Sequence, residues 1–243
     1  MKLSTAFNYR FKVQLKNYGI GLGVYTIITL VFPLINFFRG ITYSSPATDI
    51  LFMTACVVLG GSLAIINMDF KLFIQNGMSR NNIFISYLLS IVSISALVTF
   101  FVLSLQELAK HFLPNHIRFS IFLSDIYSPN NVFLAFFILF LLFNLVGSLG
   151  LLIGTFNIRF GNTVKFIALG FLIASPSLVG ATLYYSGPSI RSSLLSLLKL
   201  ALGISKDYFN PLNLIVTMFT LTLLLVVTSF LMIRKAEIKR VNT

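Results

Sequence analysis

The side chains that could bind a metal ion or transfer protons are few in this chain, and most lie outside its apolar stretches. Glu107, His111 and His116 form the densest cluster of such groups, in a polar segment between two apolar stretches. Carboxylate and imidazole groups are zinc ligands, but a solvated loop explains three such residues more simply. We therefore expect no metal site here and no catalytic residue elsewhere in the chain.

Three kinds of chemistry lack the residues that they need. The chain has no G-x-x-x-x-G-K-[ST] motif, so any ATP hydrolysis must come from another polypeptide. It has no H-E-x-x-H motif and no paired glutamates, which disfavours an intramembrane metalloprotease. No Asp, Glu, Lys, Arg or His falls in the centre of an apolar stretch, where a proton-coupled carrier would need such a group. We expect that the chain itself is not an enzyme.

The composition is that of a protein whose solvent is lipid. Hydrophobic residues make up 57% of the 243 residues and charged residues only 10%, with a mean hydropathy of +0.93, whereas soluble domains carry about 25% charged residues. A membrane-spanning helix needs about 20 apolar residues. We predict an all-α membrane protein with a single domain of six transmembrane helices. The predicted spans are residues 19–38, 51–68, 83–105, 132–156, 166–187 and 212–233.

The distribution of basic residues predicts the orientation in the membrane. If the N-terminus is cytoplasmic, twelve of the 18 Lys and Arg residues lie on the cytoplasmic side. Cytoplasmic loops carry an excess of Lys and Arg, so both termini are expected to be cytoplasmic. The net charge of +12 is then mostly a charge that faces anionic lipid. We expect no nucleic-acid partner, because no stretch of the chain could form a soluble domain to carry a binding patch.

Residues 1–18 are predicted to form a cytoplasmic interfacial helix before the first span. Phe7, Phe11 and Leu15 recur at intervals of four residues, which places them on one side of a helix. Basic residues such as Arg10 lie largely elsewhere. A basic amphipathic helix of this kind can lie in the inner membrane interface. The alternative is a frayed basic tail.

The polar link between the second and third spans has the pattern of a short amphipathic helix followed by a tight turn. Gly77 can end a helix in the left-handed conformation, and Ser79 is a good N-cap for the third span. The pattern fits an ordinary interfacial connection, and it also fits a small helix offered to a cytoplasmic partner. The residues that form one stripe at spacing i, i+3, i+4, i+7 are Phe70, Phe73, Ile74 and Gly77.

Six spans with both ends inside, together with the turn "NGMSRNNIF", resemble the membrane subunit of an ABC-2 type ABC transporter, which has the type V exporter architecture. Many Gram-positive members of that family carry a similar G-x-S-R turn after span two, and Gly77, Ser79 and Arg80 match it. The resemblance implies that this link is a coupling helix docked in a groove of an ATPase. The residues that would couple are Phe70, Phe73, Ile74, Gly77, Ser79 and Arg80.

The resemblance also implies partners and cofactors. The permease would act with a second copy or a homologue, and the pair would bind two cytoplasmic ABC ATPase subunits. ATP and Mg²⁺ would bind to those ATPase chains, and this chain would hold no cofactor. In the family the N-terminal helix packs beside the ATPase, and short re-entrant helices precede the last span.

The outer segment between the fifth and sixth spans is expected to form a helix that half-enters the outer leaflet. Ser192, Ser196 and Lys199 make a polar stripe along it, and leucines fill the rest of the surface. We interpret this segment as a re-entrant helix that acts as an outer lid on a transport path. The alternative is a plain interfacial anchor.

Polar and helix-bending residues inside the spans could line a path or join helices. Asn144 lies near the middle of span four, and a buried amide in lipid seeks a partner across a helix interface. Asn36 and Pro176 are the other candidates for a path or an interface, and the proline is expected to kink its span. Two G-x-x-x-G pairs predict close approach of helices. They are Gly19/Gly23 and Gly150/Gly154.

The expected cargo is a hydrophobic or amphipathic peptide, with a lipid second. A path lined by phenylalanine, leucine, serine and asparagine offers ions nothing to replace their hydration shells. The resemblance points the same way, since compact permeases of the family commonly export peptide toxins, bacteriocins or lipids, or provide self-immunity by clearing such peptides. We expect an exporter of the bacterial plasma membrane. The alternative is a membrane immunity or sensor protein that binds a toxin without transport.

Overall fold

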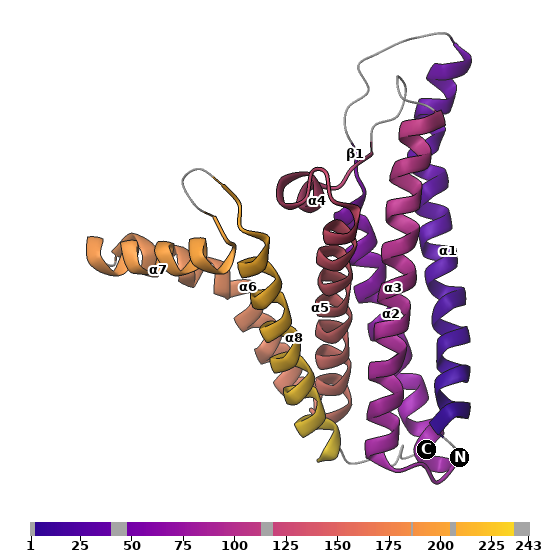
Figure 1. Ribbon diagram of the computed structural model, residues 1–243. Helices are drawn as coiled ribbons and strands as arrows, with labels where there is room; N and C mark the ends of the chain where they lie inside the picture. Colours follow the sequence, from indigo (N-terminus) through magenta and orange to yellow (C-terminus); the bar gives the residue numbers. More distant parts are fainter. Residues whose placement is uncertain (1–2, 40–47, 113–118, 186, 205–207, 236–243) are drawn as a thin grey trace.

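Helices form almost the whole of the structure, as the apolar composition predicts. The computed structural model describes residues 3–39, 48–112, 119–185, 187–204 and 208–235 (Figure 1). Two short strands, β1 (Thr48–Asp49) and β2 (Phe119–Ser120), pair in parallel beside the helices. The all-α fold class is confirmed. The helices in chain order are α1 (Leu3–Phe38), α2 (Ile50–Gln75), α3 (Arg80–Phe112), α4 (Phe122–Tyr127), α5 (Val132–Arg159), α6 (Asn162–Tyr185), α7 (Pro188–Ala201) and α8 (Pro211–Arg234).

Within the described residues, four helices are long and apolar enough to cross a membrane, as judged by length and composition: α2, α3, α5 and α8. Each begins close to the start of a predicted span. Of the other two predicted spans, residues 19–38 lie within α1, and residues 166–187 overlap α6 as far as its last residue, Tyr185. Large apolar side chains cover the outside of the molecule; Phe133 is 90% exposed and Phe100 is 67% exposed. Lipid suits such a surface, and the chain is a helical membrane protein.

α5 lies in the middle of the bundle and packs against α2, α3 and α8, while α1 packs against α2 and α3. Glycines let α5 approach α2 closely. A Cβ atom added at Gly150 would lie 2.6 Å from the Cβ of Ser62, and one added at Gly154 would lie 2.7 Å from Cδ1 of Ile66. The predicted close approach is confirmed for this G-x-x-x-G pair.

The second G-x-x-x-G pair has no such role among the residues that the structure describes. There, a Cβ atom added at Gly19 or at Gly23 would meet nothing within 4 Å. The prediction of a close helix contact is therefore wrong for this pair within one chain. A different glycine, Gly61 of α2, lets α1 pack closely against α2. A Cβ atom at Gly61 would collide with the ring of Tyr18 on α1.

α1 is one continuous helix, and the predicted break between residues 1–18 and the first span is not found. Two polar side chains near its start, Arg10 and Gln14, are buried and have partners on other helices. Arg10 pairs with Asp69 of α2, and Gln14 accepts a hydrogen bond from Ser90 of α3. The start of α1 therefore packs inside the bundle and does not lie flat as a separate interfacial helix.

α2 likewise continues through the predicted short amphipathic helix, so residues 70–75 are its last turns. No glycine or proline lies between Gly61 and Gly77, so nothing ends the helix earlier. The charge of Asp69 does not interrupt it either, because that carboxylate is buried with Arg10. The link between α2 and α3 is consequently a turn of four residues, 76–79.

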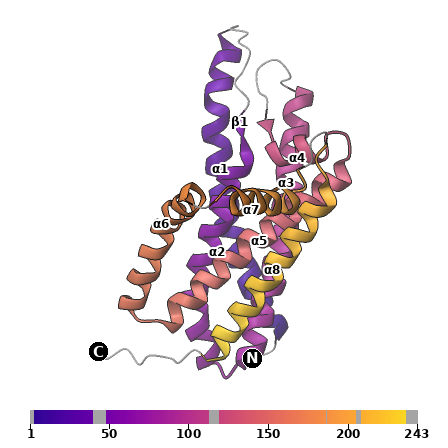
Figure 2. The same ribbon diagram turned by 90° about the vertical axis from the view of Figure 1, so that its left-hand side faces the viewer.

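The two ends of the bundle carry different elements (Figures 1 and 2). The end named here the turn end holds the start of α1, the α2–α3 turn, the α5–α6 junction and the end of α8. The opposite end holds β1, β2 and α4, and α7 lies near the start of α8. The described chain thus begins and finishes at one end. Which side of the membrane that end faces stays a prediction.

α6 and α7 lie outside the bundle of α1, α2, α3 and α5, and α7 packs mainly against α8 among the described helices. No described helix packs along α6, and its described side chains are exposed or half-buried throughout (Figure 2). α7 contacts α8 and lies crosswise to it (Figure 1). These two helices leave broad apolar faces open.

Candidate functional site

The α2–α3 turn has the geometry of a Schellman helix end. Gly77 has a φ of +73°, in the left-handed region that favours glycine. The backbone N–H of Met78 donates to the carbonyl oxygen of Phe73 at 3.0 Å, and that of Gly77 donates to Ile74 at 2.9 Å. This pair of bonds defines the motif. The predicted left-handed helix end at Gly77 is confirmed.

α3 begins directly after the turn with the predicted N-cap. The Oγ of Ser79 accepts a hydrogen bond from the backbone N–H of Asn82 at 3.4 Å. A Ser side chain in this position satisfies an N–H group that the helix leaves unpaired. Because both helix ends are capped and the turn is short, α2 and α3 are joined stiffly.

The apolar stripe of the predicted coupling helix faces the bundle. Phe70 and Phe73 are 1% and 0% exposed, and Ile74 is half-buried. The ring of Phe73 packs edge-on against Tyr9 of α1, with 6.1 Å between ring centroids. Phe70 and Phe73 therefore anchor the turn and present no face to a partner. The exposed residues of this segment are Lys71, Leu72, Gln75, Asn76, Gly77, Ser79 and Arg80.

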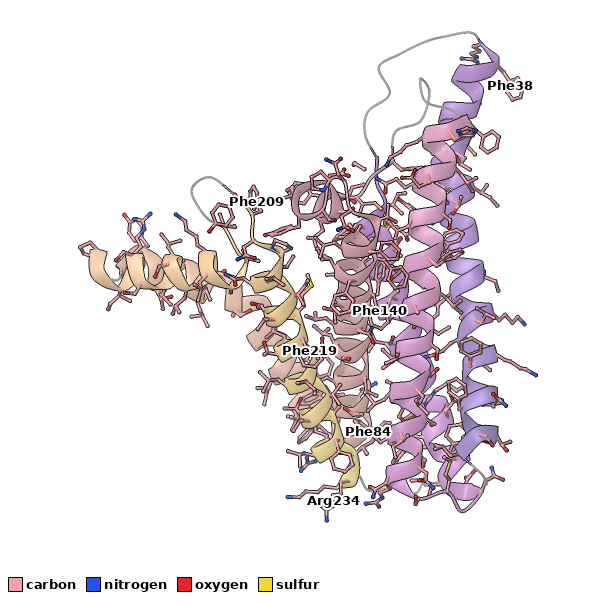
Figure 3. The ribbon with its side chains drawn as sticks, viewed as in Figure 1. Phe38, Phe84, Phe140, Phe209, Phe219 and Arg234 are labelled. Carbon is pink, nitrogen blue, oxygen red and sulfur yellow. The ribbon has the colours of Figure 1, made fainter. Side chains whose placement is uncertain are left out.

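Arg80 connects the turn to the last helix. Its Nη1 donates a hydrogen bond to the carbonyl oxygen of Arg234 at 2.6 Å. Carbonyl groups at a helix C-terminus lack partners in their own helix, and a cation there is favourable. One turn along α3, the ring of Phe84 packs on Phe230 with 5.1 Å between centroids. Figure 3 shows Phe84 and Arg234 at the same end of the bundle. The turn is thus attached to α8 at two levels.

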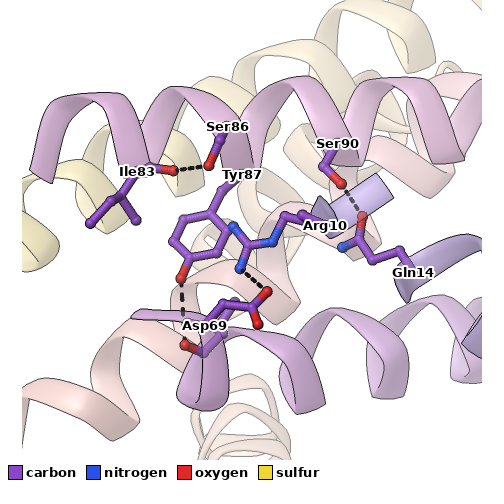
Figure 4. Close-up of polar contacts among 8 residues, drawn as sticks. Arg10, Gln14, Asp69, Ile83, Ser86, Tyr87 and Ser90 are labelled. Atoms are coloured by element: carbon purple, nitrogen blue, oxygen red, sulfur yellow. Dashed lines mark hydrogen bonds and ion pairs between the residues drawn. The ribbon is translucent and has the colours of Figure 1, made fainter. Parts of the chain in front are cut away.

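A buried ion pair that sequence reasoning missed lies beneath the turn (Figure 4). Nη2 of Arg10 lies 3.1 Å from Oδ2 of Asp69, and both side chains are buried. The Cζ of Arg10 lies 3.2 Å from the ring centroid of Tyr87 on α3. A guanidinium stacked on an aromatic ring is attracted by the ring face. These contacts join α1, α2 and α3, and they put a basic residue expected at the surface into the interior.

The exposed surface of the turn end is basic. The carboxylate that the structure describes at this end, Asp69, is buried and paired. A surface of this kind attracts anionic lipid head groups and acidic protein surfaces. Its exposed cations are Lys12, Lys16, Lys71, Arg80, Arg234 and Lys235.

The predicted outer helix is present as α7, but its arrangement differs from a re-entrant lid. It projects away from α1–α5 in Figure 1 and covers no part of the described bundle. Gly203, with a φ of +66°, follows its end. Ser192, Ser196 and Lys199 of the predicted stripe lie on exposed positions. α7 is a single helix that lies crosswise to α8 (Figure 1), an arrangement that fits the alternative of an interfacial anchor; its role as a lid stays a prediction.

The leucine face of α7 forms a groove with α8. The groove measures about 570 Å³, and its walls include Leu194, Leu197 and Val216. Nearby, the hydroxyl of Tyr127 donates to the carbonyl oxygen of Leu202 at 2.5 Å. Burial raises the pKa of the Tyr127 hydroxyl above its ordinary range. This bond ties α4 to the residue after α7.

Of the three predicted path residues, only Asn144 has a described side chain. It is 5% exposed, and its Nδ2 donates to the carbonyl oxygen of Phe140 in its own helix at 2.8 Å. The amide nitrogen of Asn144 therefore does not make the predicted hydrogen bond to a neighbouring helix. The side chains of Asn36 and Pro176 lie outside the described part of the structure, although α1 and α6 continue as helices through both positions.

The cluster of potential metal ligands is dispersed as far as the structure describes it. Glu107 pairs with Lys110 at 2.8 Å on the surface, and the ring of His111 packs edge-on against Phe112. His116 lies outside the described residues. Among the residues that are described, no three His, Cys, Asp or Glu side chains lie close enough together to hold a metal ion.

Comparison of the chain with protein-family models, with curated proteins and with solved structures finds no match. The resemblance to ABC-2 permeases therefore rests on the α2–α3 turn and on the order of the predicted spans.

Proposed function

We propose that this chain is the membrane-spanning permease subunit of an ATP-driven ABC exporter, with ATP and Mg²⁺ bound by separate cytoplasmic ATPase subunits. The observation that carries the proposal is the α2–α3 turn. Its tip at Gly77, Ser79 and Arg80 is exposed, both of its helix ends are capped, and other helices are attached beneath it. A short, capped and exposed turn of this kind could bind an ATPase subunit and pass the movement of that subunit to the attached helices.

The attachments beneath the turn support a role in transmitting movement. α2 and α3 leave the turn directly, so they move with it. Asp69 holds α1 through Arg10, and Arg80 holds the end of α8. A displacement of the tip would therefore reach four long helices. A passive interfacial loop has no need of these contacts.

The chemistry of the turn end indicates the kind of partner surface. Lys71 and Arg80 are exposed and carry no described carboxylate beside them. An ATPase groove with acidic side chains would complement them, and electrostatic complementarity of this kind favours specific and rapid association. A second permease copy, or a homologue, would complete the transporter. α6 leaves room for it, because no described helix packs along that helix.

The proposed cargo is a hydrophobic or amphipathic peptide, with a lipid second. A groove of about 830 Å³ runs between α1 and α2, and its walls include Val24, Phe52 and Met53. Ligand sites in proteins commonly measure about 300–1,000 Å³, so the groove can take an acyl chain or several apolar side chains. Tyr25 and Asp49 supply polar groups along it. Cargo of this kind would already be concentrated in the membrane.

Purification of the tagged chain from its native membranes, with cross-linking, tests the proposal. We expect an ABC ATPase to co-purify in equal number. The Arg80→Glu variant should lose it, whereas Arg191→Glu, which reverses an exposed charge on α7, should retain it. A membrane immunity or sensor protein would instead emerge alone or with a toxin. Preparations that never contain an ATPase would refute the proposal.

A further inference from the structure

We propose that Arg10, Asp69 and Tyr87 form a latch, named here the α1 latch, that holds the first turns of α1 against the α2–α3 turn and opens by admitting water to the arginine. The inference goes beyond the proposed function, because it concerns only contacts within this chain. It holds for any partner that binds the turn.

The latch joins three helices at one point. Arg10 is 0% exposed, and its guanidinium lies between the carboxylate of Asp69 and the ring of Tyr87 (Figure 4). The hydroxyl of Tyr87 donates in turn to the carbonyl oxygen of Ile66 on α2, at 3.4 Å. α1, α2 and α3 therefore meet on a single side chain from α1.

The closed latch leaves the arginine incompletely satisfied. Its Nε and Nη1 are buried without a hydrogen-bond partner, although a guanidinium carries five N–H donors. Burial of an unpaired donor disfavours the closed state, and the ion pair with Asp69 recovers only part of the cost of removing both charges from water. Packing thus favours the closed latch, and hydration of the charges favours an open one.

The position of the latch makes its opening a local event. At the start of α1, Ala6 is 0% exposed and lies in one buried apolar cluster with Phe73 of α2 and Met78 of the turn, and Tyr9 packs edge-on against Phe73. Beyond the latch, Gln14 and Ser90 hold α1 to α3 again. If the latch opens, residues 3–9 can leave the bundle while the rest of α1 stays. The underside of the turn around Phe73 would then become accessible.

The accessibility of a buried cysteine beside the latch tests this proposal. Ala6→Cys, in a Cys56→Ser background that removes the native exposed thiol, places a reporter one turn before Arg10. A water-soluble maleimide should label it only when the start of α1 has moved. Asp69→Asn removes the counter-charge and keeps the shape, so we expect labelling to become at least about tenfold faster in nanodiscs. Lys12→Met, which removes an exposed cation from the same helix, should leave the rate unchanged.

Two further sets of variants separate a latch from a merely structural pair. Tyr87→Leu removes the stacking ring and should speed labelling about threefold or more, whereas Tyr87→Phe keeps the ring and should stay near the parent rate. Arg10→Met combined with Asp69→Leu replaces the charges by apolar groups of similar size. These gain nothing from hydration, so the reporter should then react more slowly than in the parent.

Ala135→Cys gives the control for general unfolding, because Ala135 is 4% exposed near the start of α5; it should stay unlabelled in every folded variant. The proposal is overturned if the reporter at position 6 reacts no faster in Asp69→Asn. It is also overturned if the apolar pair reacts as fast as Asp69→Asn. Should Asp69→Asn fail to fold, equal rates in Tyr87→Leu and Tyr87→Phe would overturn the proposal, and a faster rate in Tyr87→Leu alone would support it.

Discussion

The guanidinium of Arg80 donates a hydrogen bond to the carbonyl oxygen of Arg234 at 2.6 Å, between residues 154 positions apart in the chain. Arg80 is the first residue of α3, and Arg234 is the last residue of α8. One exposed side chain thus ties the α2–α3 turn to the end of the last helix. The arginine that matches the G-x-S-R pattern therefore has an intramolecular partner, and it remains accessible to another chain.

Reversal of the charge at Arg80 should uncouple the protein without unfolding it. A carboxylate in Arg80→Glu is favourable at the N-terminus of α3 and unfavourable beside the C-terminus of α8, each by about 0.3–1 kcal/mol, so the two effects offset. We expect stimulation of ATP hydrolysis to fall at least about tenfold, which corresponds to about 1.4 kcal/mol. Arg80→Lys keeps the charge and should lose less. Full stimulation in Arg80→Glu, measured after the separately purified ATPase is added in excess, would contradict this role.

Substitution of glycine by alanine should have opposite effects on stability at Gly150, which lies in the contact between α5 and α2, and at Gly23, which faces open space. Gly150→Ala puts a Cβ atom 2.6 Å from the Cβ of Ser62, and overpacking of this kind costs about 1–3 kcal/mol. Gly23→Ala meets open space and should stabilise α1 by up to about 1 kcal/mol, because glycine is a poor helix former. Thermal unfolding in detergent measures both.

A compensating variant identifies the cause. Ser62→Gly removes the Cβ atom that Gly150→Ala would strike, so the double variant should regain part of the lost stability. Equal unfolding temperatures for Gly150→Ala and Gly23→Ala would show that α5 and α2 do not meet as closely as described.

The crosswise placement of α7 predicts that its two faces meet different solvents. Ser196 lies on the polar stripe and Leu197 on the leucine face, yet both are exposed in the chain. In liposomes, with Cys56→Ser, a water-soluble maleimide should label Ser196→Cys about tenfold faster than Leu197→Cys, because an amphipathic helix buries its apolar face in the interface. Equal labelling of both faces would mean that α7 is solvated all round.

Sequence patterns predicted the features that depend on neighbours along the chain. Apolar length alone located the four helices that are long and apolar enough to cross a membrane, and the glycine–serine turn predicted the left-handed helix end at Gly77 and the cap at Ser79. Such features follow from local geometry. The same reasoning placed Phe73 on the right helix face, but it could not decide whether that face met a partner or α1.

Features that depend on which helices meet could not be predicted. Arg10 and Asp69 lie 59 positions apart, and each has the pattern of a surface charge. The one available signal was Asp69 itself, one of only two acids predicted on the side that carries twelve of the Lys and Arg residues. The two G-x-x-x-G pairs look alike in sequence, and only the packing of α5 against α2 distinguishes Gly150/Gly154 from Gly19/Gly23.

Orientation in the membrane gives another prediction. The turn end should face the cytoplasm, because it carries more of the exposed Lys and Arg residues than the opposite end. Asn76 lies in the exposed turn, and Asn130 is exposed at the opposite end. On intact cells, an impermeant maleimide should label Asn130→Cys, and it should label Asn76→Cys only after permeabilisation. The reverse pattern would place the turn outside and would remove the basis for a cytoplasmic ATPase partner.

ATP hydrolysis by the purified permease–ATPase complex in nanodiscs is the measurement that tests the central claim most directly. The account predicts that amphipathic peptides, and more weakly lipids, raise the basal rate. It also predicts that Arg80→Glu abolishes this rise while Arg191→Glu preserves it. If a sugar or an ion raises the rate while peptides and lipids leave it flat, the proposed cargo is wrong. If no hydrolysing subunit ever accompanies the chain, the proposal of an ATP-driven permease is contradicted.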